Sequence, residues 1–321
     1  MPDASLGGTV VTLILPTYRR PDGLGRALRG LAGQRDPGVT WEVVVIDNDD
    51  PPGAEDVFAA AERELPVPAR YIREPIRGSA HARNRGIAEA TGDIIVMMDD
   101  DVEPDPGWLA LLIEPILAGR ADGTGGRVVL DPQVKRPEWF DEVGIGGYLA
   151  RWDLGSDERP LADAEIVVTS NCAYRRDILR RTGGFDPELG PRGTTPLVGD
   201  DALITRRFRE QGGRVSWVPA ALVVHELPCT RLNRRYLLRR AYAQGRSDWI
   251  LNRSSHRARR FGGARVALSW LRIELGRRRI EGLGSPSTRF HLAADLARTA
   301  GALREAAALG SSRTRRGRIR E

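Results

Sequence analysis

The chain has 321 residues, of which 41% are hydrophobic and 29% charged, as expected for a soluble globular protein with one large domain or two modest ones. Its 2 cysteines, Cys172 and Cys229, exclude a disulfide framework, so we expect reduced thiols and a cytoplasmic protein. No apolar run approaches the roughly 18 residues that span a bilayer, and residues 1–8 lack a signal-peptide pattern.

Charge is distributed unevenly along the chain. Residues 231–321 contain 23 arginines and 6 acidic residues, whereas residues 1–230 contain 26 basic and 37 acidic residues. This asymmetry indicates an anionic partner, such as a membrane surface, a phosphorylated acceptor or nucleic acid. The alternative is a set of solvated helix faces in an arginine-biased protein.

Short apolar runs alternate with segments of helical periodicity in the first part of the chain. The predicted strands are Val10–Leu15, Trp41–Ile46, Tyr71–Ile72 and Ile94–Met98. The predicted helices are Leu24–Leu31, Val57–Glu64 and Ala80–Ala90. This alternation predicts an α/β fold, with a mostly parallel central sheet covered by helices on both faces.

The pattern is more mixed between residues 123 and 225. Strands are expected at Gly125–Leu130, Glu165–Thr169, Val215–Val218 and Ala221–Val224, and helices at Arg175–Thr182 and Asp200–Gln211. The Gly- and Pro-rich segment Pro187–Gly199 is predicted to be a mobile loop. From Arg231 the chain becomes helical and arginine-rich, with one broad apolar face over Arg289–Leu309 and a disordered tail at 311–321.

Acidic residues follow two of the predicted strands. Asp47 ends the second strand, and Asp99, Asp100 and Asp101 end the fourth. Ligands bind at the carboxyl ends of strands in such sheets. Alternate side chains of an extended segment point the same way, so Asp99 and Asp101 can hold one Mg²⁺ or Mn²⁺ ion together. The alternative is an acidic turn that opens a helix.

Further polar residues come later in the chain. His225 ends a strand and is either a structural histidine or a ligand that suits Mn²⁺ better than Mg²⁺. Asp200 and Asp201 open a predicted helix, where one of them is expected to cap the helix. The other is then available to a cleft.

These residues belong to a series of short motifs between residues 9 and 228. The series is Pro16-Thr17-Tyr18-Arg19, Asp47, Ala82-Arg83-Asn84-Arg85-Gly86, Asp99-Asp100-Asp101, Asn171, Gly183-Gly184-Phe185-Asp186, Gly199-Asp200-Asp201 and His225. Their order and spacing resemble the family 2 glycosyltransferases, a large inverting group with the GT-A fold.

The resemblance implies a nucleotide-sugar site. Residues implied to contact the donor are Pro16, Thr17, Tyr18, Arg19, Asp47, Gly78, Arg83, Asp99, Asp100 and Asn171. Among these, Asp47 would accept the imide hydrogen of uracil, an imide that thymine shares. The donor is therefore expected to be a UDP-sugar, with a dTDP-sugar as the alternative.

The resemblance also implies the metal ligands and the general base. Asp101 would be the principal ligand of Mn²⁺ or Mg²⁺, with Asp99 and His225 beside it. Asp201 matches the aspartate that acts as base in the family. Asp200 stands where the family usually has glutamate, so Asp200 is the alternative base.

The expected enzyme is an inverting glycosyltransferase that moves a sugar to an acceptor hydroxyl in polysaccharide, glycolipid or natural-product biosynthesis. The alternatives are an inactive nucleotide-sugar-binding homologue and a nucleotidyltransferase. The catalytic domain is expected at 1–228, with a nucleotide-sugar half at about 9–118 and an acceptor half at about 119–228.

A basic helical region is expected at 229–310. Within it, Tyr236–Trp249 and Val266–Ile280 mix arginines with Leu, Ile, Trp and Tyr. Basic helices of this kind can lie at an anionic membrane surface, which predicts peripheral attachment at the inner face of the cell membrane. No nucleic-acid-binding motif accompanies the charge, so no specific nucleic acid is expected.

Overall fold

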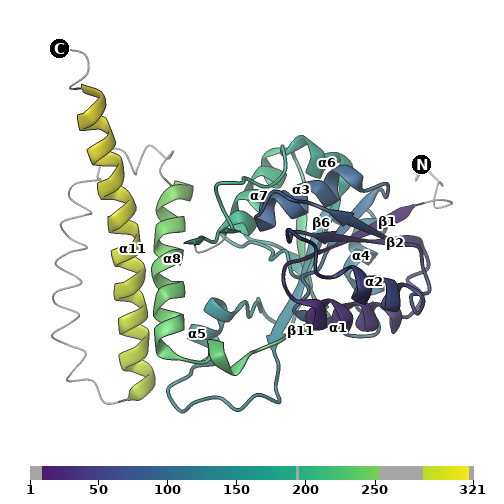
Figure 1. Cartoon of the computed structure of the whole chain (residues 1–321), viewed down its shortest axis with the longest axis horizontal. Coiled ribbons are helices and arrows are strands. Elements are labelled where there is room, and N and C mark those ends of the chain that lie inside the picture. Colours follow the sequence, from purple (N-terminus) through teal and green to yellow (C-terminus); the bar gives the residue numbers. More distant parts are fainter. Residues whose placement is uncertain (1–8, 193–194, 253–284, 318–321) are drawn as a thin grey trace. The chain divides into compact units, whose positions relative to one another are not determined.

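The computed structural model describes residues 9–192, 195–252 and 285–317. The chain divides into two compact units (Figure 1). The first unit contains Met1–Asp131, Arg151–Gly193 and Asp200–Glu226. The second contains Pro132–Ala150, Thr194–Gly199 and Leu227–Glu321.

The first unit is built on a mixed sheet of nine strands within the described residues, in the order β3-β2-β1-β4-β8-β6-β11-β5, with β7 also paired to β11. The strands are β1 (Val10–Thr17), β2 (Thr40–Asp47), β3 (Ala69–Arg73), β4 (Ile94–Met97), β5 (Val102–Pro104), β6 (Gly123–Leu130), β7 (Arg159–Pro160), β8 (Cys172–Arg175) and β11 (Val215–His225). Neighbours β3, β2, β1 and β4 are parallel, as are β6 and β11, whereas β8, β5 and β7 run antiparallel to their partners.

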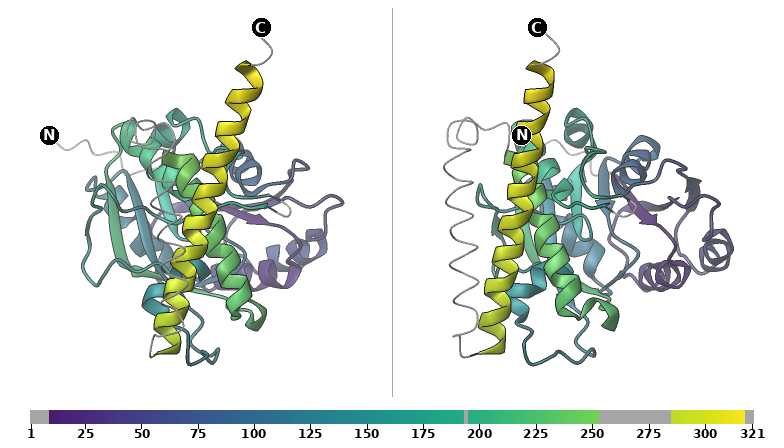
Figure 2. Two further views of the ribbon diagram at one scale, coloured as in Figure 1. Left: turned by 90° about the vertical axis from the view of Figure 1, so that its left-hand side faces the viewer. Right: turned by 60° about the vertical axis from the view of Figure 1, so that its left-hand side comes forward.

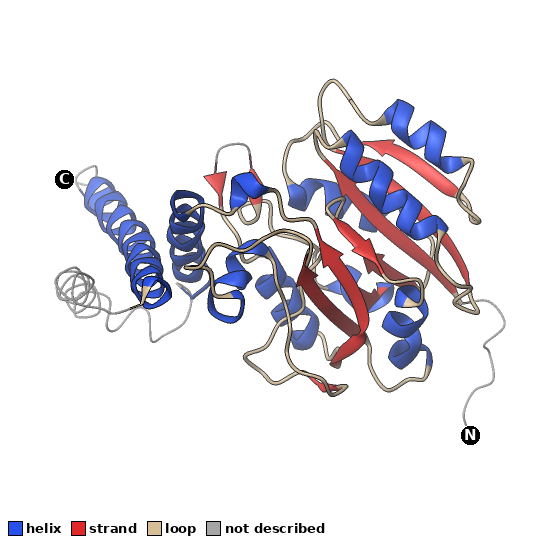
Figure 3. Cartoon of the chain, turned by 90° about the horizontal axis from the view of Figure 1, so that it is seen from below, coloured by secondary structure: helices blue, strands red, loops and turns tan. Residues whose placement is uncertain are grey.

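Helices cover both faces of this sheet (Figure 3). They are α1 (Pro21–Ala32), α2 (Glu55–Glu62), α3 (Ser79–Glu89), α4 (Trp108–Leu117), α6 (Arg176–Arg181) and α7 (Asp200–Glu210). The two-residue strands β9 (Pro191–Arg192) and β10 (Thr195–Pro196) precede α7 in the chain. The predicted α/β architecture is therefore confirmed, and so are the four strands and three helices predicted before residue 100.

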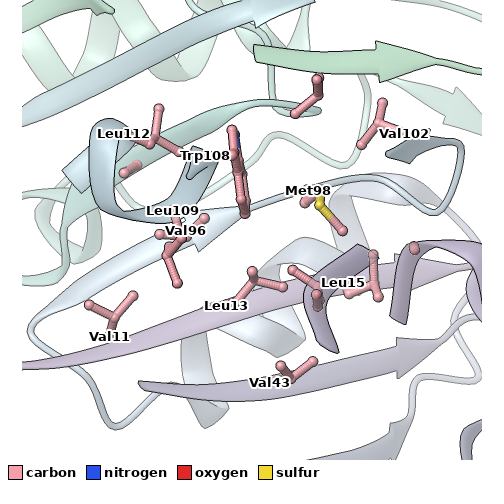
Figure 4. Packing of buried hydrophobic residues seen from close by; sticks show 14 of the residues in the cluster. Val11, Leu13, Leu15, Val43, Val96, Met98, Val102, Trp108, Leu109 and Leu112 are labelled. Carbon is pink, nitrogen blue, oxygen red and sulfur yellow. The ribbon is translucent and has the colours of Figure 1, made fainter. Parts of the chain in front are cut away.

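The two faces of the sheet have separate cores because strand side chains alternate in direction. On one face Leu13 and Leu15 pack with α1, α2 and α4, and Figure 4 shows Trp108 of α4 standing over these strands. On the other face Ile14 packs with α3, α6 and α7. Burying both faces fixes each strand's register and so fixes where its carboxyl end lies.

Three predicted elements differ from the structure. The segment Glu165–Thr169 contains no strand, because Val167 packs directly over Gly125 in the core without joining the sheet. The strand in this region is β8, which includes Arg175, so α6 begins one residue later than predicted.

The third difference is that two predicted strands form one. β11 runs from Val215 to His225 with a shift of register against β6 between Val218 and Leu222. Pro219 lies within this shift and has no N–H to give to a ladder, so the strand bulges rather than ends.

The second unit contains a pair of long helices that lie side by side (Figure 2), α8 (Arg234–Asn252) and α11 (Pro286–Gly317). Shorter elements of this unit are α5 (Glu142–Ile145), η1 (Gly146–Leu149) and η2 (Cys229–Arg231). A Cβ atom added at Gly245 would lie 1.7 Å from the carbonyl oxygen of Arg298, and one at Gly301 would lie 1.9 Å from that of Tyr242. The absence of side chains at these glycines lets the two backbones touch.

The second unit also contains a segment that the sequence assigns to the acceptor half of the catalytic domain. Within residues 132–150, Trp139 packs on Phe290 with ring centroids 4.9 Å apart, and Asp141 lies 2.9 Å from His291. Both partners belong to α11, so this segment joins the C-terminal helices instead.

The C-terminal predictions have mixed outcomes. α11 continues to Gly317, so residues 311–317 are helical rather than disordered. The predicted helix Val266–Ile280 lies outside the described residues. None of the helices in the described ranges combines the length and hydropathy needed to cross a membrane.

Candidate active site

A cavity of about 270 Å³ opens at the carboxyl ends of β1 and β4, beside the first turn of α3. Its lining residues are Pro16, Thr17, Tyr18, Asn48, Arg77, Gly78, Ser79, Ala82, Arg83, Asp99, Asp100 and Asp101. The ends of parallel strands converge here because β2, β1 and β4 are neighbours in the sheet. The cavity therefore lies where the sequence predicts a ligand site.

Eight of the residues predicted to contact donor or metal line this cavity. They are Pro16, Thr17, Tyr18, Gly78, Arg83, Asp99, Asp100 and Asp101. Gly78 has φ +143°, a conformation that glycine adopts readily, and its N–H donates to the side chain of Asn48 at 2.8 Å. The hydroxyls of Tyr18 and Ser79 are buried without a hydrogen-bond partner. Such unpaired groups in a cavity wall are suited to a polar ligand.

Arg19 pairs with an acidic side chain that is not among the lining residues of the cavity. Its backbone is left-handed, with φ +53°, and its guanidinium Nε lies 3.1 Å from both carboxylate oxygens of Asp49. Arg19 does not line the cavity, although the sequence places it with the donor contacts. The guanidinium carbons of Arg19 and Arg77 lie 5.2 and 4.7 Å from the centre of the Tyr18 ring, and of these two arginines Arg77 lines the cavity.

Asp47 does not line the cavity either. Its side chain is buried and accepts hydrogen bonds from the Tyr71 hydroxyl and from the backbone N–H groups of Asp49, Gly53 and Ala54. A carboxylate satisfied in this way organises the loop after β2. The predicted contact between Asp47 and a uracil imide stays a prediction, and it would have to compete with these four donors.

Asn171 has a structural position in the core. Its amide nitrogen donates to the carbonyls of Arg127 and Ala221, each at 2.9 Å, and its amide oxygen accepts from the Trp108 indole at 2.7 Å. The side chain is fully buried and joins β6, β11 and α4. Asn171 thus has a role in packing, and its predicted contact with the donor stays a prediction.

Arg83 links the two acidic groups of the site. Its guanidinium donates to Asp99 at 2.8 Å and to Asp200 at 3.0 Å, and its side chain is only 8% exposed. The end of β4 and the first turn of α7 are thereby joined through one buried cation. A buried charge that lost either partner would be left partly uncompensated.

Asp100 points toward the β1 end. It accepts a hydrogen bond from the Thr17 hydroxyl at 2.7 Å. Burial, together with the negative charge of Asp101, raises the pKa of Asp100 to about 7. Asp100 therefore holds a proton far more readily than an exposed aspartate.

Asp101 immediately precedes β5 and His225 ends β11, and the pairing of these two strands brings the two side chains together. His225 Nε2 lies 3.4 Å from Asp101 Oδ1, and His225 Nδ1 is buried without a hydrogen-bond partner. Asp99 is directed to Arg83 rather than to this pair. In the described ranges, no group of three or more His, Cys, Asp or Glu side chains is placed to hold a metal ion. A carboxylate and an imidazole nevertheless fit a cation that completes its shell with phosphate oxygens and water.

Asp201 differs from its neighbour Asp200. Asp200 is paired with Arg83, whereas Asp201 Oδ1 accepts a hydrogen bond from the backbone N–H of Thr169 at 3.1 Å. Burial and the charge of Asp200 raise the pKa of Asp201 to about 7. Asp201 is therefore suited to accept a proton near neutral pH.

Sequence reasoning missed several polar residues of this edge. Asn48, Arg77 and Ser79 line the cavity, and Arg20 and Glu226 form an ion pair beside Asp101. Arg20 and Glu226 each lie next to a predicted residue, Arg19 and His225. Adjacency in sequence was the available signal, but it does not say which side chain faces the site.

The fold matches that of GT-A glycosyltransferases. The mannosyltransferase PcManGT from Pyrobaculum calidifontis, in complex with GDP-Man and Mn²⁺, aligns with a TM-score of 0.55 and 20% identity. The match covers 96% of this chain and 76% of that chain. At this identity the likeness concerns the fold alone.

Sequence comparison identifies the family. The model of glycosyl transferase family 2 matches residues 12–183, and the chain belongs to this family. The glucosyl-dolichyl phosphate glucuronosyltransferase of Haloferax volcanii is 31% identical over 188 residues, which are 57% of this chain and 58% of that protein. The succinoglycan biosynthesis protein ExoM of Rhizobium meliloti is 29% identical over 238 residues, 72% of this chain and 71% of that protein.

Proposed function

We propose that the chain is an inverting glycosyltransferase that moves a sugar from a nucleoside-diphosphate sugar to an acceptor hydroxyl. The observation that carries this proposal is the link through Arg83 between the cavity, at Asp99, and the carboxylates of α7, at Asp200. A donor held in the cavity would have its reacting end near a group that can take a proton. Family membership supports the same reaction class.

A divalent cation, Mn²⁺ or Mg²⁺, would be held by Asp101 and His225 together with donor phosphate oxygens. When bound, the cation stabilises the negative charge that develops on the departing nucleoside diphosphate. The chain itself supplies Arg83 and Arg77 to the cavity, and both are permanently charged.

Asp201 would act as the general base. In the proposed step the acceptor oxygen attacks the anomeric carbon and its proton passes to Asp201. At the same time the bond from the anomeric carbon to the diphosphate oxygen breaks. Direct displacement inverts the anomeric centre, so an α-linked donor would give a β-linked product.

The donor nucleotide is proposed to be UDP, with GDP and dTDP as the competitors to test. The family resemblance favours UDP, whereas the structurally similar PcManGT was solved with GDP-Man. The Asp47 carboxylate is already satisfied, and the Asn48 amide donates to two carbonyls and accepts from Gly78. Base recognition would then depend on the Tyr18 ring and backbone groups more than on these two side chains.

The basic C-terminal region is proposed to lie at an anionic membrane surface, where a lipid-linked acceptor could be met. Arg234, Arg235 and Arg239 are exposed on the first turns of α8. Flotation with vesicles of neutral lipid and with vesicles containing about a third phosphatidylglycerol tests this in low salt. Equal recovery with both kinds of vesicle would refute the membrane proposal.

The proposed activity is tested first by binding and then by product. Thermal melting with UDP, GDP, dTDP and CDP, each with and without Mn²⁺, should show stabilisation by one diphosphate that is lost in Asp101→Ala. Stabilisation by a ligand follows RT ln(1 + [L]/Kd), about 2.7 kcal/mol at one hundred times Kd. Donor turnover and the product's anomeric NMR signals then establish the reaction. Absence of any nucleotide effect, or a product that retains the donor configuration, would refute it.

A further inference from the structure

Arg20 lies at the acidic edge of the site and contacts three carboxylates. Its Nη1 is 3.3 Å from Asp101 Oδ2, its Nη2 is 2.6 Å from Glu226 Oε2, and its Nε is 3.4 Å from Asp100 Oδ1. The Arg20 side chain is 26% exposed, so solvent screens these contacts only in part. Arg20 immediately precedes α1, and its carbonyl oxygen accepts the hydrogen bond from Leu24.

The two oxygens of Asp101 therefore have different neighbours. Oδ1 faces the imidazole of His225 at 3.4 Å, and Oδ2 faces the guanidinium of Arg20 at 3.3 Å. A divalent cation bound by Asp101 and His225 would approach a fixed positive charge. Neighbouring positive charges repel, so the Arg20 guanidinium lowers the affinity of Asp101 and His225 for a divalent cation.

Glu226 offers Arg20 a second partner. The Arg20–Glu226 contact is the shortest of the three, and Glu226 immediately follows the last residue of β11, His225. The guanidinium can therefore keep its pairing with Glu226 while the Asp101 carboxylate turns to a metal. Arg26 also pairs with Glu226, at 2.7 Å, and its contacts in the described part of the chain do not include Asp101.

We propose that Arg20 is a built-in counter-cation that competes with the divalent cation for Asp101, and that Glu226 holds the guanidinium aside when the metal binds. This inference rests on the proposed function, because it concerns the same cation. Metal alone then binds weakly, since it must displace Arg20. The nucleoside diphosphate adds negative charge, offsets the repulsion, and makes donor and metal bind together.

The test is direct binding of Mn²⁺ without nucleotide, measured by electron paramagnetic resonance of free Mn²⁺ and by calorimetry. Arg20→Gln should bind Mn²⁺ about tenfold more tightly than the unmodified chain, because one nearby positive charge is removed. Arg26→Gln is the matched control, since it loses a pairing with Glu226 but none with Asp101, and it should leave the affinity unchanged. Unchanged or weaker binding by Arg20→Gln, with an unaltered melting temperature, would overturn the inference.

Glu226→Gln separates two possible roles of that carboxylate. If Glu226 acts through Arg20, the single substitution weakens Mn²⁺ binding, while in the Arg20→Gln background it has no further effect. A loss of affinity in that background would make Glu226 a metal ligand and overturn its assigned role.

Measuring Mn²⁺ binding in the presence of UDP or GDP distinguishes a failure of this inference from a failure of the proposed function. If the unmodified chain binds Mn²⁺ with nucleotide, the donor site stands, and the variants decide the role of Arg20. If no variant binds Mn²⁺ even with nucleotide, the proposed metal site fails and the inference fails with it.

Discussion

At the carboxyl edge of the sheet, Arg83 is 8% exposed and contacts two carboxylates, Asp99 and Asp200. In the α8–α11 pair, by contrast, Arg298 is 48% exposed and pairs with Asp248. Exposed pairs contribute about 0–1 kcal/mol. Breaking a buried pair costs about 3–5 kcal/mol, because a charge is left without compensation. The same residue type thus positions carboxylates of the candidate active site at Arg83 and contributes little to stability at Arg298, where the close backbone approach at Gly245 and Gly301 brings the helices together.

The largest expected effect is at the carboxylate that is not paired with Arg83. Asp201→Asn removes the proposed base and should reduce transfer by about 10²–10⁴-fold while nucleotide binding persists. The measurement is kcat for transfer together with thermal melting in the presence of nucleotide. If Asp201→Asn keeps full activity and Asp200→Asn loses it, the base is Asp200 instead.

The next effect concerns Asn171, which the structure places in the core. Asn171→Ala leaves the carbonyls of Arg127 and Ala221 and the Trp108 indole without their partner, at a cost of about 1–3 kcal/mol per unsatisfied group. Urea unfolding should show the loss of stability, and the donor KM should not change. A raised donor KM with unchanged stability would show that Asn171 contacts the donor.

Backbone packing in the helix pair can be tested at a single position. Gly301→Ala places a methyl group 1.9 Å from the Tyr242 carbonyl, and such overpacking typically costs about 1–3 kcal/mol. Gly147→Ala, where a Cβ would meet nothing within 4 Å, is the control in the same unit. Thermal unfolding should distinguish the two, and equal stability of both variants would mean that the helices are not closely packed at Gly301.

The smallest effect is the pH dependence of the reaction. Asp201 must be deprotonated to accept a proton, and its pKa is raised to about 7. The rate should therefore rise with pH below that value, by about tenfold per pH unit, and level off above it. Rates from pH 5 to 9 provide the measurement. A flat profile through pH 7 would show that Asp201 does not take the proton in the rate-limiting step. Asp100 has a similar pKa but is not proposed to take the proton.

The sequence pattern predicts correctly that the site lies at the carboxyl ends of the parallel strands, and the reason is physical. Short apolar strands that run directly into polar residues, as at Thr17 and Asp99, place those residues at one edge once the strands are parallel. Patterning within the first 118 residues was therefore sufficient to predict strands β1 to β4, helices α1 to α3 and most of the cavity wall.

The sequence could not say which polar side chains point into the core. Asp47 and Asn171 have the residue types of a binding site, yet both are satisfied by neighbouring backbone groups. Arg83 and Asp200 are 117 positions apart, so their pairing depends on how α3 and α7 pack. Residue type and order define candidates, and only packing decides their partners.

Strand β3 stands at one end of the sheet order, so one side of its backbone lacks a neighbouring strand in the described part of the chain. Of its five residues, two are arginines, Arg70 and Arg73, and Arg70 is held by Glu42 and Glu89. A terminal strand without charge is a template onto which another chain can add. The arginines of β3 therefore help to keep this chain from joining its own copies edge to edge when it is concentrated.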